Sequence, residues 1–455
     1  MKHFAKLTGL GALGAAALSA LPVWAQEATE ATTEAAAEVA AEVVPVMDKG
    51  DVSWMMVSTV LVLFMTIPGL ALFYGGLVRS KNMLSILMQT TMIACVMMLV
   101  WVIYGYSFAF GGSTSPWWGG TAKMFLSGVT ADSMAATFSA GYVIPEYLFI
   151  AFQMTFAAIT PALIIGAFAE RVKFSAVLVF SVLWGTFSYF PIAHMVWDAN
   201  GYLYGKGAID FAGGTVVHIN AGIAALVGCI MIGKRVGYGK DNMAPHSMVL
   251  TMVGASMLWV GWFGFNVGSN LEANGGATLA MINTFIATAA ATVTWALLES
   301  MLRGKASMLG AASGMVTGLV AVTPACGTIG PMGAILLGVL ATFASYFFVT
   351  VVKHKLKYDD SLDVFGIHGV AGIVGAVLTG VFSAAAFGGV KGDDYAMMMQ
   401  LWVQIEGVLI TIVWSGIVSF VLFKAIDMTI GLRVDNDTER QGLDLASHGE
   451  QAYHN

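Results

Sequence analysis

The chain has 455 residues, of which 58% are hydrophobic and only 11% are charged, and its mean hydropathy is +0.78. A water-soluble domain of this composition would expose extensive apolar surface, so the sequence predicts an all-α integral membrane protein. A net charge of −6 without a basic stripe argues against a nucleic-acid-binding protein. The three cysteines lie at no metal-binding spacing, so we expect neither a metal site nor a cofactor.

The first 25 residues have the pattern of a cleavable signal peptide. Lys2 and Lys6 precede an apolar run, and Val23 and Ala25 supply the small residues of a cleavage site. Residues 26–48 form an acidic linker rich in Ala and Glu, in which Glu recurs at every fourth position from Glu30. Like charges at this spacing repel each other on a helix, so we expect a solvated linker.

Apolar stretches long enough to cross a bilayer as helices then recur along the chain. We predict eleven transmembrane helices, at 55–78, 86–110, 147–168, 174–196, 216–232, 247–268, 277–298, 308–322, 330–352, 365–387 and 397–426. Residues 49–430 would form the membrane domain. Residues 431–455 would follow it as a C-terminal tail.

Lys and Arg concentrate in alternate loops between the predicted helices. Fifteen of them lie in one set of loops and the tail, whereas the opposite set holds only Lys49, Lys123, Lys206 and Lys391. Basic residues are retained on the cytoplasmic side of a membrane. We therefore expect a multi-pass protein of the cytoplasmic (inner) membrane, with its N-terminus outside and its C-terminus inside. An odd number of helices after a cleaved signal requires the same orientation.

Short motifs repeat at an offset of five predicted helices. The third helix contains AITPA (158–162) and the eighth contains AVTPA (321–325). The fifth and tenth helices contain His218 and His368, each in the pattern His-x-x-Ala-Gly-Ile. Because five is odd, the two halves would face opposite ways across the membrane, as in the five-plus-five inverted repeats of many transporters. The eleventh helix would stand outside the repeat.

The two histidines are the first candidates for a functional site, because ionisable side chains within a membrane are costly and rare. We expect them to meet, since equivalent positions of an inverted repeat converge on one central region. The alternative for either one is a structural histidine that bonds to a backbone carbonyl. A metal site would need a third ligand, which the sequence lacks. We also expect the carboxylate of Asp363, five residues before His368, at the start of the tenth helix, where it suits the helix dipole.

Longer motifs around these residues resemble the ammonium transporter (Amt/Mep/Rh) family, bacterial branch. They are DFAGGTVVHINAG (210–222), GWFGFNVGS (261–269), GAFAERVKFSA (166–176), VTPACG (322–327) and DVFGIHGVAGIVG (363–375). The resemblance extends from about residue 52 to the C-terminal SHGEQAY. It implies a transporter rather than an enzyme, with an eleven-helix inverted-repeat fold, assembly as a homotrimer, one pore in each subunit and a role in nitrogen metabolism.

The resemblance assigns pore residues by matching motif. His218 and His368 would be the twin histidines of the pore, and Phe156 and Phe265 would be the stacked phenyl gate. Without the resemblance, the two phenylalanines are better explained as packing residues.

The resemblance also implies an outer site for ammonium, or for its analogue methylammonium. Trp197, Phe156 and Ser269 would surround the cation, and Asp210 would support this vestibule. On the residues alone, Trp197 is better explained by the aromatic belt at the membrane interface and Ser269 as a hydroxyl at a helix end. The implied mechanism is that the ion is deprotonated and that ammonia crosses the apolar pore. An ammonium sensor (transceptor) that signals through the tail is the alternative function.

The tail leaves two alternatives open. It contains no apolar run and carries five acidic residues, which favours disorder. The resemblance instead implies a cytoplasmic element that docks on the membrane domain and takes part in binding a PII-type nitrogen regulatory protein. In the last predicted helix, Gln404 and Glu406 are expected to form interhelical hydrogen bonds.

Overall fold

The computed structural model describes residues 45–453, so the predicted signal peptide and nearly all of the predicted linker lie outside the described residues. By contacts the chain divides into two compact units. The described part of the first comprises residues 45–46 and 139–142, in which the Val46 N–H donates to the Gly141 carbonyl (2.8 Å). The second, residues 47–138 and 143–455, holds the long helices.

The part of the chain from 45 to 453 contains ten helical spans that are long and apolar enough to cross a membrane, together with one shorter apolar helix. The count agrees with the eleven helices predicted, although the eighth is only Met308–Val322 (α14). The other spans are Lys49–Leu77 (α3 Lys49–Phe64, η1 Met65–Leu70, α4 Ala71–Leu77), Ser80–Phe110 (η2 Ser80–Asn82, α5 Met83–Val100, η3 Trp101–Gly105, α6 Tyr106–Phe110), Glu146–Phe168 (α7 Glu146–Ile164, η5 Ile165–Phe168), Phe174–Gly205 (α8 Phe174–Trp184, η6 Gly185–Tyr189, α9 Phe190–Trp197, α10 Tyr202–Gly205), Gly214–Ile232 (η7 Gly214–Ile219, α11 Asn220–Ile232), Met248–Gly268 (α12), Gly275–Arg303 (α13), Pro331–Leu356 (α15 Pro331–Phe347, η8 Phe348–Val352, α16 Lys353–Leu356), Phe365–Phe382 (η9 Phe365–Gly369, α17 Val370–Phe382) and Met397–Thr429 (α18).

Some helix ends differ from the prediction, in one case because a polar cap extends the helix beyond its apolar run and in another because the helix ends early. The first helix begins at Lys49 rather than at residue 55, since the Asp48 carboxylate accepts hydrogen bonds from the N–H groups of Gly50 (2.7 Å) and Asp51 (3.1 Å). The tenth span ends at Phe382 rather than at residue 387, and a separate short turn, η10 (Ala385–Phe387), follows it.

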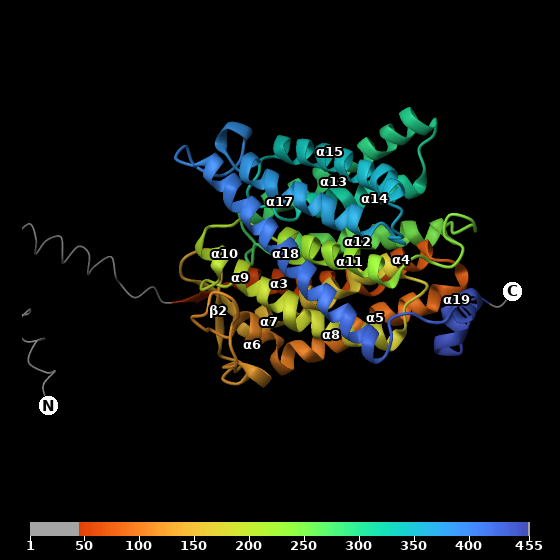
Figure 1. Ribbon diagram of the computed structural model, residues 1–455. Coiled ribbons are helices and arrows are strands. Elements are labelled where there is room, and N and C mark those ends of the chain that lie inside the picture. Colours follow the sequence, from red (N-terminus) through yellow and green to blue (C-terminus); the bar gives the residue numbers. More distant parts are fainter. Residues whose placement is uncertain (1–44, 454–455) are drawn as a thin grey trace, which may run out of the picture. The chain divides into compact units, whose positions relative to one another are not determined.

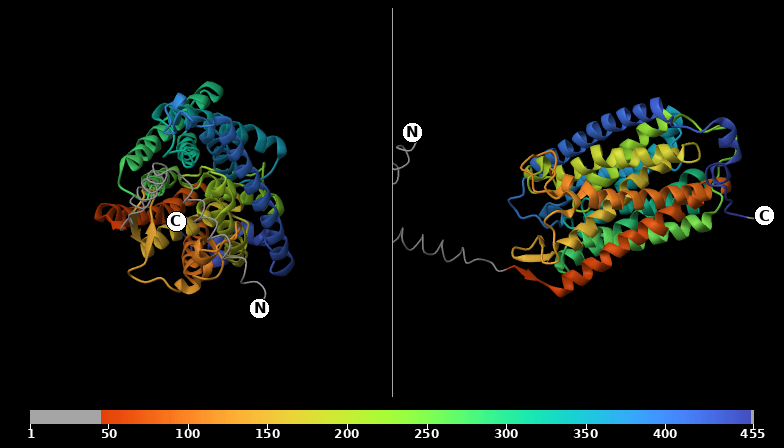
Figure 2. Two further views of the ribbon diagram at one scale, coloured as in Figure 1. Left: turned by 90° about the vertical axis from the view of Figure 1, so that its left-hand side faces the viewer. Right: turned by 90° about the horizontal axis from the view of Figure 1, so that it is seen from below.

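The long helices of the second unit run roughly alongside one another, and several are seen nearly end-on in the left-hand view of Figure 2. α18 (blue) crosses this bundle obliquely and packs against α17, α11 and α8 (Figure 1). On other sides of the bundle α3 and α4 pack against α12, and α13 packs against α14 and α15. The helices that carry the two histidines, η7–α11 and η9–α17, contact each other and α14 and lie in the interior.

The segments between the spans contain structure that the sequence does not predict. β2 (Met134–Ala136) pairs antiparallel with β3 (Tyr142–Pro145), with Ala135 opposite Ile144. β1 (Val46–Met47) and a turn, η4 (Met124–Leu126), complete these elements. Strands of two to four residues give too few alternating positions to stand out in a sequence. The predicted all-α class therefore holds for the spans but not for these segments.

The tail is folded over residues 431–453. It contains α19 (Asn436–Gln441) and η11 (Asp444–His448). The Asp444 carboxylate accepts hydrogen bonds from the N–H groups of Leu84 (3.0 Å) and Ser85 (2.8 Å) at the start of α5, and Glu439 accepts one from the Val236 N–H (2.6 Å). The alternative of a disordered tail is therefore wrong for these residues, because charged groups dock it without an apolar run.

Candidate functional site

His218 and His368 lie side by side in the interior of the bundle. Their Nδ1 atoms are 3.2 Å apart, and their rings stack with centroids 5.3 Å apart and planes 18° from parallel. Both side chains are buried, with 1% and 3% of their surface exposed. A hydrogen bond between two Nδ1 atoms requires one ring to donate and the other to accept, so a neutral pair shares one proton across this contact. The predicted meeting of the two histidines is confirmed.

Two glycines of the repeated His-x-x-Ala-Gly-Ile pattern explain why the histidine helices can approach so closely. A Cβ on Gly222 would lie 2.4 Å from the Cα of Gly369, so the two backbones touch where only glycine fits. A Cβ on Gly372 would lie 3.1 Å from Cγ1 of Ile219 and 3.3 Å from Cβ of His218. Gly222, from the first motif, therefore allows close contact with the segment that carries His368. Gly372, from the second motif, allows close contact with the segment that carries His218.

A third ring fixes the orientation of His218. The indole of Trp262 stacks on the imidazole with centroids 5.4 Å apart and planes 20° from parallel. Trp262 is held in turn, because its Nε1–H donates to the hydroxyl of Thr323 (2.9 Å) and that hydroxyl lies 2.7 Å from the Leu319 carbonyl. Trp262 lies within the GWFGFNVGS motif (261–269), but no spacing or repeat in the sequence predicts its contact with His218.

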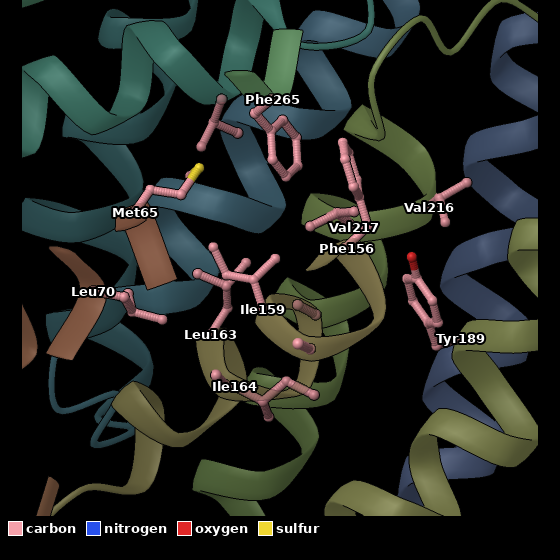
Figure 3. Close-up of a cluster of buried hydrophobic side chains, with 14 of the residues drawn as sticks. Met65, Leu70, Phe156, Ile159, Leu163, Ile164, Tyr189, Val216, Val217 and Phe265 are labelled. Carbon is pink, nitrogen blue, oxygen red and sulfur yellow. The ribbon is translucent and has the colours of Figure 1, made fainter. Parts of the chain in front are cut away.

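The histidines face a narrow cavity of about 10 Å³. Its wall is made of Met65, Leu70, Phe73, Ile159, Leu163, Val217, His218, Leu258, Trp262, Phe265, Val316 and His368. Figure 3 shows several of these apolar side chains grouped together. Nε2 of His218 has no hydrogen-bond partner among residues 45–453. Because an unpaired buried polar atom is costly, this nitrogen is available to a small polar guest.

Two stacked phenyl rings close the cavity at one end. The rings of Phe156 and Phe265 have centroids 4.1 Å apart and planes 24° from parallel, and both side chains are buried. Phe265 lines the cavity, and its ring lies 5.9 Å from the His218 ring, whereas Phe156 lines a larger hollow on the other side. The pair therefore separates the two spaces.

We call the larger hollow the vestibule. It has a volume of about 550 Å³, and Phe156, Trp197, Asp210 and Ser269 are among its lining residues. The rings of Trp197 and Phe156 meet edge to face, with centroids 5.9 Å apart. The Ser269 hydroxyl donates to the Phe265 carbonyl (2.8 Å), so its lone pairs remain free to accept a donor. Every residue that the sequence analysis assigned to a vestibule cation site thus lines one hollow.

Asp210 shapes the vestibule through the backbone. Its carboxylate accepts hydrogen bonds from the N–H groups of Gly213 (3.0 Å), Thr215 (2.9 Å) and Val216 (3.0 Å), and so caps the helix that carries His218. Its carbonyl accepts the Nε1–H of Trp197 (2.9 Å), which fixes the indole. Burial raises the pKa of the Asp210 carboxyl to about 6 despite these donors.

The equivalent carboxylate of the second histidine helix is Asp360, which the sequence analysis missed. It accepts hydrogen bonds from the N–H groups of Val364 (3.0 Å) and Phe365 (2.8 Å) at the start of η9. Asp363 lies at the start of this helix as expected, directly before Val364, but its carboxylate forms an ion pair with Lys353 while Asp360 accepts the N–H groups. The signal was present, since Asp210 precedes His218 by the same eight residues that separate Asp360 from His368.

An ion network lies beside Asp360. The Arg235 guanidinium forms two hydrogen bonds with Asp359 (2.8 and 2.9 Å) and an ion pair with Glu170 (3.3 Å), which also pairs with Arg79 (2.8 Å). Burial opposes ionisation of Glu170, but the guanidinium groups of Arg235 and Arg79 outweigh it and lower the pKa of this carboxyl. All these charged groups have partners, so the network joins loops rather than offering a binding site.

The polar residues of the last long helix tie it to the vestibule. Gln404 is buried and bonds to both the N–H (2.7 Å) and the carbonyl (2.8 Å) of Ile209, directly before Asp210, and to the Ala376 carbonyl (2.8 Å). Glu406 pairs with Lys206 (2.7 Å) and accepts the Tyr202 hydroxyl (2.9 Å). Within residues 45–453, no three His, Cys, Asp or Glu side chains come together as metal ligands.

Comparison with known proteins places this arrangement in a family. The model of the Ammonium Transporter Family matches residues 53–453. The chain is 47% identical over 412 residues to an ammonium transporter of Aquifex aeolicus, covering 90% of this chain and 94% of that protein. It is 44% identical over 411 residues to an ammonium transporter of Bacillus subtilis, covering 90% and 99%.

Solved structures agree. The crystal structure of Candida albicans Mep2 superposes with a TM-score of 0.78 at 34% identity, over 86% of this chain and 87% of that one. The chain belongs to the ammonium transporter family, and it is a multi-pass membrane protein whose substrate is ammonium.

Proposed function

We propose that the vestibule recruits the ammonium ion, that the ion loses a proton there, and that ammonia passes the phenyl pair into the cavity beside His218 and His368. The observation that carries the proposal is the imidazole pair, whose Nδ1 atoms lie 3.2 Å apart in an otherwise apolar cavity. A neutral imidazole offers a donor and an acceptor without a fixed charge.

Recruitment would rest on aromatic faces and one hydroxyl. A cation over the ring of Trp197 or Phe156 gains about 0.5 to 2 kcal/mol, and the free lone pairs of Ser269 add an acceptor. A site of this strength favours loading without trapping the ion. Asp210 would act through its hydrogen bonds to the backbone and to Trp197 rather than by direct contact.

The energies favour deprotonation before passage. Transfer of an intact ion into an apolar pore costs on the order of 20 kcal/mol by the idealised Born calculation, and several kcal/mol after relaxation. If the substrate has a pKa near that of lysine, ~10.4, loss of its proton at pH 7 costs about 5 kcal/mol. Neutral ammonia is therefore the cheaper species in the cavity. The proton either returns to the vestibule, or it crosses separately along the histidine pair.

Uptake of radiolabelled methylammonium into proteoliposomes tests the proposal. We expect the wild-type protein to accumulate label, and His218→Ala and His368→Ala to lose most of the uptake, because each leaves the other ring without its partner. Undiminished uptake by both variants would contradict the histidine route. A protein that acted only as an ammonium sensor would bind methylammonium without accumulating it.

Current recording separates the two fates of the proton. An ammonium pulse applied to proteoliposomes on a sensing electrode gives a transient current if the proton crosses, and internal alkalinisation without current if it does not. Both results are compatible with entry of ammonia. A current in His218→Ala as large as in the wild type would exclude the histidine pair as the proton's path.

We further propose that the chain lies in the cytoplasmic membrane with the vestibule outside, as a five-plus-five inverted repeat in a homotrimer. The matching environments of Asp210 and Asp360, each eight residues before a histidine, support the repeat. The excess of Lys and Arg in the loops opposite the vestibule supports the orientation. Accessibility of cysteines introduced at Ser115 and Lys305 to a membrane-impermeant reagent tests it, with labelling from outside expected only at the first.

The docked tail would lie at the cytoplasmic face and take part in binding a PII-type regulatory protein. It contacts two separate loops, through Asp444 at the start of α5 and Glu439 at Val236, so a partner on this surface could sense both. Deletion from Gly431 onward is expected to abolish ligand-dependent PII binding while the protein still assembles. Full ligand-dependent binding to the truncated protein would contradict this role.

A further inference from the structure

The vestibule holds two charged side chains, and they are of opposite sign. They are Asp210 and Lys391. The Asp210 carboxylate is buried and already accepts three backbone N–H donors, whereas Lys391 is half-buried. A hollow that collects a monovalent cation therefore has a lysine in its wall, which neither the family resemblance nor the proposed mechanism uses.

The backbone of Lys391 is fixed. Its N–H donates to the Ser383 carbonyl (3.1 Å), and the N–H of the preceding Val390 donates to the carbonyl of Thr328 (3.0 Å), which also lines the vestibule. The nearby Gly389 packs so closely that a Cβ there would lie 2.2 Å from the carbonyl of Ser383. The lysine therefore extends from an anchored segment, and its charge stays near the vestibule.

No carboxylate of the described residues neutralises this lysine. Its Nζ forms no ion pair or hydrogen bond with any residue from 45 to 453. Two of the three other lysines on the same predicted side, Lys123 and Lys206, are paired with Glu146 and Glu406. Asp393 and Asp394 follow Lys391 in the sequence, but neither reaches ion-pair distance. The positive charge therefore acts on whatever enters the vestibule.

We infer that Lys391 is a specificity-determining residue, which lowers the occupancy of the vestibule by cations in proportion to their charge. The inference rests on the proposed recruitment of ammonium at this site. Repulsion of a monovalent ion is modest, so ammonium still loads. A cation with two charges is repelled twice as strongly in energy, so the same lysine excludes it far more effectively. Lys391 thus protects the aromatic site from occupation by multivalent cations.

The size of the effect follows from Coulomb's law. Two unit charges on the order of 10 Å apart, in a medium between water and protein surface, change the occupancy about two- to fivefold. The change for a doubly charged ion is up to the square of this, about 4- to 25-fold. Because the vestibule is open to solvent, the effect shrinks as the screening length falls from about 30 Å at 0.01 M salt to about 3 Å at 1 M.

The test is methylammonium uptake into proteoliposomes by the full-length protein, with putrescine as a doubly charged competitor. At low salt, Lys391→Met is expected to lower the half-saturating methylammonium concentration about two- to fivefold at unchanged maximal rate, and to lower the inhibitory putrescine concentration by up to about 25-fold. The matched control Lys391→Arg keeps the charge and is expected to resemble the wild type. At about 1 M salt, all three proteins should converge.

Three results would overturn the inference. They are equal half-saturation in wild type and Lys391→Met at low salt, an equal shift in Lys391→Arg, or a shift that survives high salt. Lys391→Gln serves in the same way if Lys391→Met does not fold. A wild-type protein that fails to accumulate methylammonium would instead count against the proposed transport, so the two failures are distinguishable.

Discussion

The two histidine helices share a backbone design but lie in different surroundings. In each, an aspartate eight residues before the histidine caps the helix start, namely Asp210 for His218 and Asp360 for His368. Asp210 borders the vestibule with Trp197, whereas Asp360 lies beside the Lys353–Asp363 ion pair and the Arg235 network. The capping aspartates, which both helices share, position the imidazoles. The surroundings differ, because the Asp210 end borders the aromatic vestibule and the Asp360 end lies among ion pairs that link loops.

This difference indicates what each end can do. Aromatic faces and a free hydroxyl can hold a cation weakly, because neither commits a full charge to it. A set of paired charges instead stabilises loop positions and offers no free group to a solute. We therefore expect substitutions of the glycines and aspartates that both helices share to impair the histidine pair as a whole. Substitutions in the surroundings of one helix should change only the properties of that end.

The largest effect is expected from the glycines at the helix crossing. Gly222→Ala would place a Cβ 2.4 Å from the Gly369 backbone, which cannot move aside, so we predict loss of methylammonium uptake by more than about tenfold. Gly372→Ala meets the Ile219 side chain at 3.1 Å, which can yield, and should lower uptake less than about threefold. Uptake per folded protein, checked by gel filtration, measures both. An equal loss of uptake in the two variants would contradict the difference expected between these two contacts.

The capping aspartates come next. Asp210→Ala leaves three buried N–H groups without an acceptor and Asp360→Ala leaves two, at about 1 to 3 kcal/mol each. Thermal unfolding in detergent should therefore occur at a lower temperature in both variants, and lowest in Asp210→Ala. Only Asp210→Ala should also raise the half-saturating methylammonium concentration, since only Asp210 lines the vestibule, and its carboxylate bonds hold the loop whose Asp210 carbonyl accepts the Trp197 indole N–H. A similar rise in Asp360→Ala would contradict the division of roles.

Trp197 tests the aromatic end alone. Replacement by leucine removes the π face, worth about 0.5 to 2 kcal/mol, so the half-saturating concentration should rise about 2- to 30-fold while the maximal rate stays within about twofold. Trp197→Phe keeps a π face, so its half-saturating concentration should lie between those of the wild type and Trp197→Leu. A maximal rate that falls as far as the affinity would instead indicate that the indole shapes the passage.

The smallest effect concerns pH. The pKa of Asp210 is raised to about 6 by burial, so the carboxyl becomes neutral as the pH falls below that value. The vestibule then loses its negative charge, and the half-saturating concentration of the methylammonium cation should rise about two- to fivefold between pH 7 and pH 5. Asp210→Asn has no such charge to lose and serves as the control. A wild-type rise that persists in Asp210→Asn would assign the titration to another group.

Much of this arrangement could be predicted from the sequence, and the gaps have physical reasons. The eleven helices follow from apolar runs, because a membrane demands length and hydrophobicity that can be read directly. The histidine pair follows from its repeated motif. The cap formed by Asp360 was not predicted, because a cap depends on local backbone direction. Asp363, nearer the histidine, has a left-handed backbone (φ 60°), and its carboxylate pairs with Lys353.

Other features depend on contacts that no local pattern encodes. Trp262 stacks on His218 only because Thr323, from a distant helix end, holds its indole. The tail docks through Asp444, whose partners are backbone N–H groups more than 300 residues earlier, and every residue type except proline can supply those groups. Long-range pairing of this kind becomes visible only when the fold is known.

The central claim is that the apolar cavity passes only solutes that can shed a proton. The most direct measurement compares methylammonium uptake with the flux of potassium, a monovalent cation that has no proton to lose, in the same proteoliposomes. We predict that methylammonium accumulates while potassium flux stays at the level of protein-free vesicles. Potassium flux carried by the protein at a comparable rate, and lost in His218→Ala, would contradict the account.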